Sequence, residues 1–105
     1  MTKQPTYEVV TFNLREGVER DAFLASVDAM TAWVRGQPGF LSRDLIEAGD
    51  GEWIDVVRWA DMNTAKAAAA AAMQAPECGP MMSLIAPTSV QMRHGSLALQ
   101  STTAR

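Results

Sequence analysis

Four stretches of the chain carry the pattern of hydrophobic and polar positions that is typical of strands. Residues 7–14 are rich in Val, Thr and aromatic side chains, which fit a pleated surface. Residues 40–48 and 52–60 flank Gly49-Asp50-Gly51, whose residue types tolerate a positive φ, so they predict a β-hairpin. Residues 88–94 alternate strictly between two faces and predict the last strand.

Other stretches have helical patterns. In residues 18–34, apolar side chains recur at spacings of four, three and four and form one stripe along a helix. Asp61 is a suitable N-cap for a second helix over residues 62–73, which is mostly alanine. Because that helix has little side-chain bulk, it must either lie very close to the sheet or leave a space beneath it. Pro76 interrupts it, and residues 77–86 predict a short third helix.

The order of these elements is β-α-β-β-α-β, with the short helix placed before the last strand. This order is typical of the ferredoxin-like α+β fold, in which both main helices cover one face of a four-stranded antiparallel sheet. After Gly95 the composition changes to mostly Ser, Thr, Ala and Gln. We therefore predict one domain over residues 1–95 and a polar C-terminal tail over residues 96–105.

The predicted strands carry apolar side chains on both faces. In adjacent pairs such as Val9-Val10 and Val56-Val57, the two side chains point to opposite sides of the sheet. Since the helices cover only one side, we expect a second copy of the chain to cover the other, sheet against sheet, in a homodimer. A ligand or a different protein would be the alternative cover.

Composition narrows the partners and the compartment. Apolar residues make up 48% of the 105 residues and charged residues 20%, which is typical of a globular domain. The net charge of -3 argues against nucleic acid as a partner. The single cysteine, the lack of an apolar leader and the lack of a run of about 20 apolar residues predict a cytoplasmic protein that does not bind membranes.

The chain resembles the antibiotic biosynthesis monooxygenase family of the dimeric α/β-barrel superfamily over about residues 6–95. The resemblance is carried by the order and spacing of Phe12, Gly17, Phe23, Pro38-Gly39-Phe40, Asp50-Gly51, Val56-Val57-Arg58-Trp59, Ala65 and Pro76. It implies a dimeric α/β barrel and a small-molecule pocket between the sheet and the helices of each subunit.

The family includes cofactor-independent oxygenases that form quinones, so the resemblance implies such an activity on an aromatic or quinone-like compound, without metal or cofactor. The family also includes haem-degrading enzymes, which use an asparagine on the first strand, a tryptophan and a haem-ligating histidine. Asn13 matches the asparagine, but residues 62–86 contain neither Trp nor His. The resemblance therefore does not extend to haem degradation.

Two side chains are candidates for catalysis. His94 is the only side chain with an ordinary pKa near neutrality, which makes it the candidate base, although it would equally suit an exposed strand end. Asn13 offers an amide donor, or else binds local backbone. The candidate substrate contacts are the flat rings of Trp33 and Trp59 and the flexible side chains of Met73 and Met82, whose alternative role is core packing.

Asp55 and Cys78 leave further alternatives open. Asp55 interrupts an apolar strand, so it either pairs with an arginine such as Arg43 or Arg58 or faces a polar part of the pocket. Cys78 is either inert or paired with His94, and one Cys with one His is too few for a zinc site. Besides the oxygenase, we consider a non-catalytic binding protein and an isomerase or cyclase that uses His94 or Asp55 for proton transfer.

Overall fold

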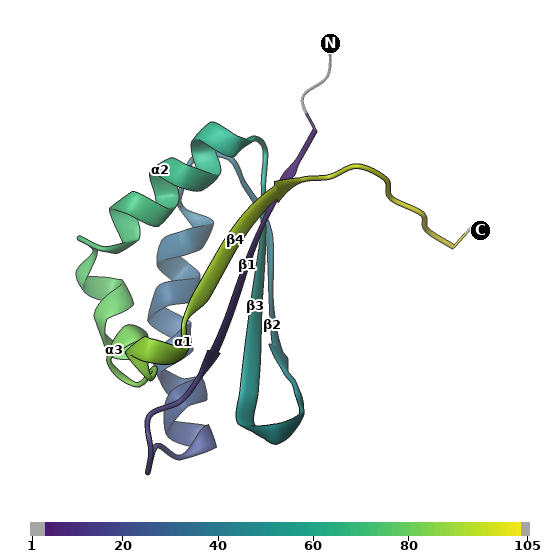
Figure 1. Cartoon of the computed structure of the whole chain (residues 1–105). Coiled ribbons are helices and arrows are strands. Elements are labelled where there is room, and N and C mark those ends of the chain that lie inside the picture. The colour runs from purple at the N-terminus through teal and green to yellow at the C-terminus, as the bar shows by residue number, and fades with distance from the viewer. Residues whose placement is uncertain (1–3, 104–105) are drawn as a thin grey trace.

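The computed structural model describes residues 4–103 and has the ferredoxin-like α+β architecture that the sequence predicts. All pairings in the four-stranded sheet are antiparallel, and the strand order is β2-β3-β1-β4. Figure 1 shows the helices on one face of this sheet. The elements are β1 (Thr6–Asn13), α1 (Arg20–Arg35), β2 (Phe40–Glu47), β3 (Glu52–Trp59), α2 (Met62–Ala72), α3 (Gly79–Ser83) and β4 (Gln91–Ser96).

The segment between α2 and β4 differs from the prediction. The expected helix over residues 77–86 is a 3-10 turn at Pro76–Cys78 followed by the single short helix α3. The chain leaves the helix there because its backbone pairs with the end of β1: Arg15 N–H donates to the Leu84 carbonyl at 2.8 Å, and Ala86 N–H to that of Asn13 at 2.9 Å. A turn at Pro87–Ser89 then delays β4, so the prediction of a strand from residue 88 was wrong.

Local chemistry explains where α2 and the hairpin turn form. The Asp61 side chain accepts from Thr64 N–H at 2.8 Å, and Asp61 N–H donates to the Thr64 hydroxyl, so a reciprocal capping box begins α2. In the turn between β2 and β3, Asp50 has φ 62° and Gly51 has φ 80°. Both residue types adopt this left-handed conformation more readily than others, as the sequence predicts.

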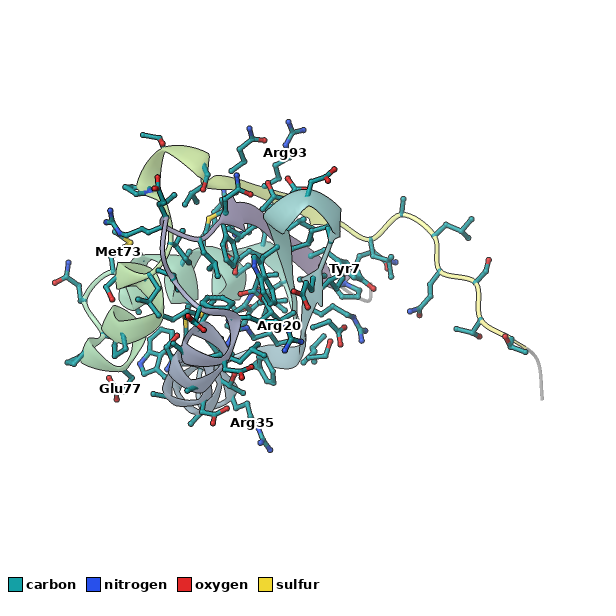
Figure 2. The ribbon with its side chains drawn as sticks, turned by 90° about the horizontal axis from the view of Figure 1, so that it is seen from below. Tyr7, Arg20, Arg35, Met73, Glu77 and Arg93 are labelled. Atoms are coloured by element: carbon teal, nitrogen blue, oxygen red, sulfur yellow. The ribbon has the colours of Figure 1, made fainter. Side chains whose placement is uncertain are left out.

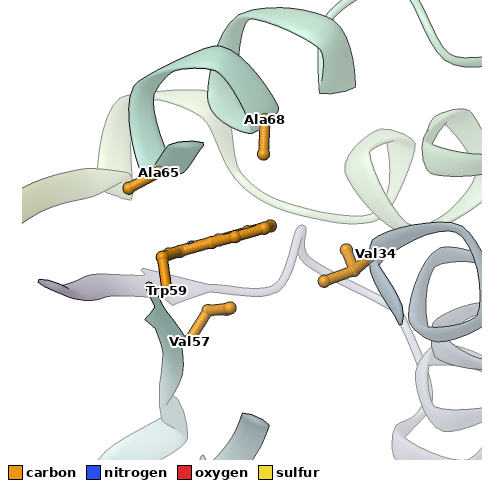
Figure 3. Packing of buried hydrophobic residues seen from close by; sticks show 5 residues of the cluster. All are labelled: Val34, Val57, Trp59, Ala65 and Ala68. Atoms are coloured by element: carbon orange, nitrogen blue, oxygen red, sulfur yellow. The ribbon is translucent and has the colours of Figure 1, made fainter. Parts of the chain in front are cut away.

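The face of the sheet beneath the helices holds the core. Along β3, Trp53, Asp55, Val57 and Trp59 are buried, whereas the intervening side chains are more accessible. Figure 3 shows the Trp59 ring lying between α2 and the sheet, below Ala65 and Ala68 and beside Val57 and Val34. A second cluster, at the other end of the sheet, contains Phe12, Phe23, Trp53 and Met81.

The opposite face of the sheet carries no helix among residues 4–103 (Figure 1). In Figure 2, Tyr7 lies on this face and Met73 on the side of the helices. Val9 pairs with Val56, Thr11 with Ile54 and Ile46 with Ile54, so apolar side chains continue across three strands of it.

After β4, Leu97 N–H donates to the Pro5 carbonyl at 2.8 Å, and the following residues extend away from the sheet (Figure 1). Among residues 4–103, no helix combines the length and the apolar character needed to cross a bilayer.

Candidate functional site

A cavity of about 380 Å³ lies between the sheet and the helices. Its walls include Val10, Phe12, Val57 and Trp59 from the central strands and Ala68, Ala69 and Ala72 from α2. Of the two arrangements that the alanine-rich helix allowed, the structure has the one that leaves a space, because a methyl group cannot fill the distance between α2 and the sheet. The volume falls in the range of about 300–1,000 Å³ that is usual for small-molecule sites.

Flexible apolar side chains surround the opening of this cavity. Met73 is 72% exposed and Met92 49% exposed, and Met82 and Val90 are also exposed while lining the same space. Exposed methionines at the border of an apolar cavity provide an entrance that can adapt to the shape of a ligand. Arg15, which follows β1, is the charged member of the exposed lining, and its Nε donates to the Ser83 carbonyl.

A buried ion pair forms part of the cavity wall. Arg43 binds Asp55 in a bidentate manner, with Nε to Oδ1 at 3.0 Å and Nη2 to Oδ2 at 2.7 Å. Arg43 also donates to the Thr31 hydroxyl on α1 and contacts the Met81 sulfur on α3. The pair therefore joins β2 and β3 to two helices, and it confirms the interpretation of Asp55 as the partner of an arginine.

A second polar pair joins β1 to the edge strand β4. Glu8 lines the cavity, and its Oε2 lies 2.8 Å from Nε2 of His94, which is directly opposite in the register of the two strands. Both side chains are largely buried, with 10% of Glu8 and 16% of His94 exposed. The Glu8 carboxylate can accept a proton inside the cavity, and the His94 imidazole can hold this carboxylate in place by a hydrogen bond.

The structure brings most of the predicted site residues to one place. Trp33, Trp59, Met73 and Met82 all line the cavity, and His94 adjoins it through Glu8. Asn13 is exposed and does not line it: its backbone N–H donates to the Ser89 hydroxyl, and it borders a shallow depression beside the hairpin turn.

Sequence reasoning missed Glu8, although it lies on the same strand face as Val10 and Phe12. The available signal was a carboxylate at one of the alternate positions of the strand that face the core. Its pairing with His94 depends on the register between β1 and β4, which the sequence does not contain.

Cys78 is buried at the start of α3. Burial raises the pKa of its thiol, the Glu77 carboxylate adds to the increase, and the Arg43 guanidinium opposes it. The neutral thiol is therefore favoured, which is typical of an inert structural cysteine. His94 binds Glu8 instead of forming the Cys-His pair considered above. Within residues 4–103, no group of three or more His, Cys, Asp or Glu side chains is arranged to hold a metal ion.

The chain is similar in structure to several crystallised proteins. SnoaB, a cofactor-independent oxygenase from Streptomyces nogalater, has 18% identity and a TM-score of 0.70, with 97% of this chain and 99% of that one covered. A Bordetella bronchiseptica protein assigned by name to the antibiotic biosynthesis monooxygenases has 16% identity and a TM-score of 0.76, with 92% and 100% covered. The ActVA-Orf6 monooxygenase of Streptomyces coelicolor, crystallised with nanaomycin D, has 18% identity and a TM-score of 0.70, with 96% and 94% covered.

These structures confirm the resemblance at the level of the fold, over nearly the whole chain. No protein-family model matches the sequence, and no curated protein matches it either.

Proposed function

We propose that this protein is a cofactor-independent monooxygenase of aromatic or quinone-like small molecules. The observation that carries the proposal is the apolar cavity between sheet and helices, which has aromatic walls and two carboxylates, Glu8 and Asp55, in its lining. Structural similarity to proteins named as cofactor-independent oxygenase and monooxygenase supports the choice of reaction.

The reaction needs a substrate that can reduce oxygen itself. In an anthrone-type compound, removal of one proton from the ring methylene leaves a delocalised anion, which transfers one electron to O₂. The substrate radical and superoxide then combine and form a carbon–oxygen bond. The resulting peroxide takes up the proton, and loss of water from it gives a ketone. One methylene and one O₂ thus become one carbonyl and one water, without any added reductant. The protein has to bind the rings, exclude water and accept the proton.

The cavity lining suits these tasks. Trp33 and Trp59 present large flat surfaces, and Met73 and Met82 adapt to the outline of a ring system. The alanines of α2 keep the space open. A larger side chain among them is therefore expected to compete with substrate directly.

Oxygen uptake tests the proposal. With 1,8-dihydroxyanthrone as the probe, we expect the protein to consume oxygen well above the rate of autoxidation and to yield the anthraquinone. Ala69→Leu fills part of the cavity and should lower kcat/KM about tenfold or more, equivalent to about 1.4 kcal/mol. Ala71→Leu is the matched control, because Ala71 is exposed on the same helix and does not line the cavity. Binding of the probe without oxygen uptake above the autoxidation rate would instead indicate a non-catalytic binding protein.

We further propose that the protein works as a homodimer in which the two bare sheet faces pack together. Val9, Ile54, Val56 and Ile46 form a continuous apolar strip there, and Ile46 is 44% exposed. Burying about 600 Å² of apolar surface on each subunit contributes on the order of 15 kcal/mol per subunit before association costs. A two-fold axis would place the same strip on both sides of the interface.

A charge in this strip should separate the subunits. We expect sedimentation at micromolar concentration to give the mass of two chains for the natural protein and of one chain for Val56→Glu, because a carboxylate would lose its water in the interface. Ala29→Glu adds the same charge to an exposed position of α1, on the other side of the sheet, and should leave the dimer intact. A single-chain mass for the natural protein would overturn the dimer.

A further inference from the structure

Two carboxylates line the cavity, and they differ in what their oxygens bind. Both oxygens of Asp55 accept hydrogen bonds from Arg43, so this carboxylate is neutralised and held in place. Glu8 uses only Oε2, which lies 2.8 Å from Nε2 of His94. Within residues 4–103, Oε1 of Glu8 has no hydrogen-bond partner, although Glu8 is only 8% exposed. Glu8 is therefore the carboxylate with an oxygen left for a ligand.

The bond between Glu8 and His94 uses one oxygen of the carboxylate, Oε2. In the tautomer that carries its hydrogen on Nε2, the imidazole of His94 donates this hydrogen to Oε2. This bond leaves the second oxygen available to the cavity that Glu8 lines, whereas His94 is not part of the lining. The imidazole, on the edge strand β4, therefore binds the carboxylate without lining the cavity itself.

Few other charges act on this pair. On α2, which packs against β1 and β4, the titratable side chain is Lys66, and it is exposed. Across the sheet Asp55 is already bound by Arg43, and Arg15 is exposed at the cavity border. On β4, Arg93 neighbours His94 in sequence and therefore points to the opposite face. His94 is the immediate charged or polar partner of Glu8.

We propose that Glu8 removes the substrate proton, and that His94 is a positioning residue that holds Glu8 for this step. The substrate's methylene C–H bond breaks, its electron pair passes into the ring system as the enolate, and a new O–H bond forms on Oε1 of Glu8. The Nε2–H of His94 donates to Oε2 before and after the transfer. The assignment rests on the proposed oxygenase function and names Glu8, rather than His94, as the catalytic base.

Hydrogen exchange tests this step without oxygen. In anaerobic D₂O, the protein should accelerate deuterium incorporation into the methylene of 1,8-dihydroxyanthrone. Mass spectrometry of the probe measures this incorporation. Glu8→Gln keeps the shape and should slow the exchange in the complex about 100-fold or more, while the Kd of the probe changes less than about threefold. Glu52→Gln is the matched control at an exposed position outside the cavity and should match the natural protein.

Two His94 variants separate positioning from a general structural role. His94→Gln retains an N–H donor and should stay within about threefold of the natural exchange rate, whereas His94→Leu should lose about tenfold at unchanged probe affinity. Because they leave the carboxylate in place, these variants test the assignment even if Glu8→Gln fails to fold, which circular dichroism would show.

The outcomes distinguish this inference from the proposed function. Exchange that persists in a folded Glu8→Gln variant would overturn the assignment, as would loss of probe binding in that variant or no exchange in the natural protein. If Glu8-dependent exchange occurs but oxygen is never consumed, Glu8 stands as the base and the oxygenase function fails. If oxygen is consumed equally by Glu8→Gln, the function stands and the base is another group.

Discussion

Replacing Asp55 with leucine is expected to lower the free energy of unfolding by about 3–5 kcal/mol, because the change leaves the Arg43 guanidinium buried without its counter-charge. The side chain of Arg43 is only 6% exposed and that of Asp55 9%, so little water reaches the guanidinium to replace the lost partner. Urea unfolding followed by circular dichroism measures the difference.

An exposed pair of the same chemistry provides the control. Arg20 and Glu47 approach as closely, with Nε to Oε1 at 2.9 Å, but their side chains are 59% and 48% exposed. Glu47→Leu should therefore cost less than about 1 kcal/mol. The double variant Arg43→Met with Asp55→Leu should recover much of the loss, because it removes both buried charges. Equal losses at Asp55 and Glu47 would contradict the role assigned to burial.

This ion pair also links strands and helices that surround the cavity. A space lined by alanine and methionine would tend to collapse, because each unfilled volume forfeits contacts between the atoms around it. Arg43 binds Asp55 on the neighbouring strand, Thr31 on α1 and Met81 on α3, so it fixes the separation of the sheet from two helices. We infer that the stability of the fold and the space available to a ligand both depend on the Arg43 guanidinium.

The sequence predicted what depends on local pattern. Alternation along β3 placed Val56 and Val57 on opposite faces of the sheet, and the Gly-Asp-Gly segment placed the hairpin turn, because strand parity and positive φ are properties of short stretches. The pairing of Asp55 with an arginine was predictable for a related reason: an acid in an apolar strand needs a partner with several donors, and Arg43 lies near it across the hairpin.

What the sequence did not reveal depends on register between distant segments. Glu8 and His94 are opposite one another only because β4 pairs with β1 in one particular alignment. The helix predicted over residues 77–86 ends early because the backbone around Leu84 and Ala86 binds the end of β1, which lies far away in the chain. A helical propensity cannot anticipate a competing strand partner.

Gly39 is the second position at which we expect a large loss of stability. Its φ is +83°, and a Cβ there would lie 2.5–2.8 Å from three side-chain atoms of Thr64. Gly39→Ala should lower the free energy of unfolding by about 3 kcal/mol, the sum of about 1–2 kcal/mol for the left-handed conformation and a similar amount for the overlap. Chemical denaturation measures it.

Gly17 separates the two contributions. It has the same φ of +83°, but a Cβ there would meet nothing within 4 Å, so Gly17→Ala should show the conformational cost alone. The excess at Gly39 must then come from Thr64, whose side chain completes the capping box of α2. Since α2 forms one wall of the cavity, Gly39→Ala should also weaken binding of 1,8-dihydroxyanthrone, whereas Gly17→Ala should not. Equal losses of stability in the two variants would show that the Thr64 side chain moves aside freely. The close approach of α2 to Gly39, directly before β2, would then not be what fixes this wall.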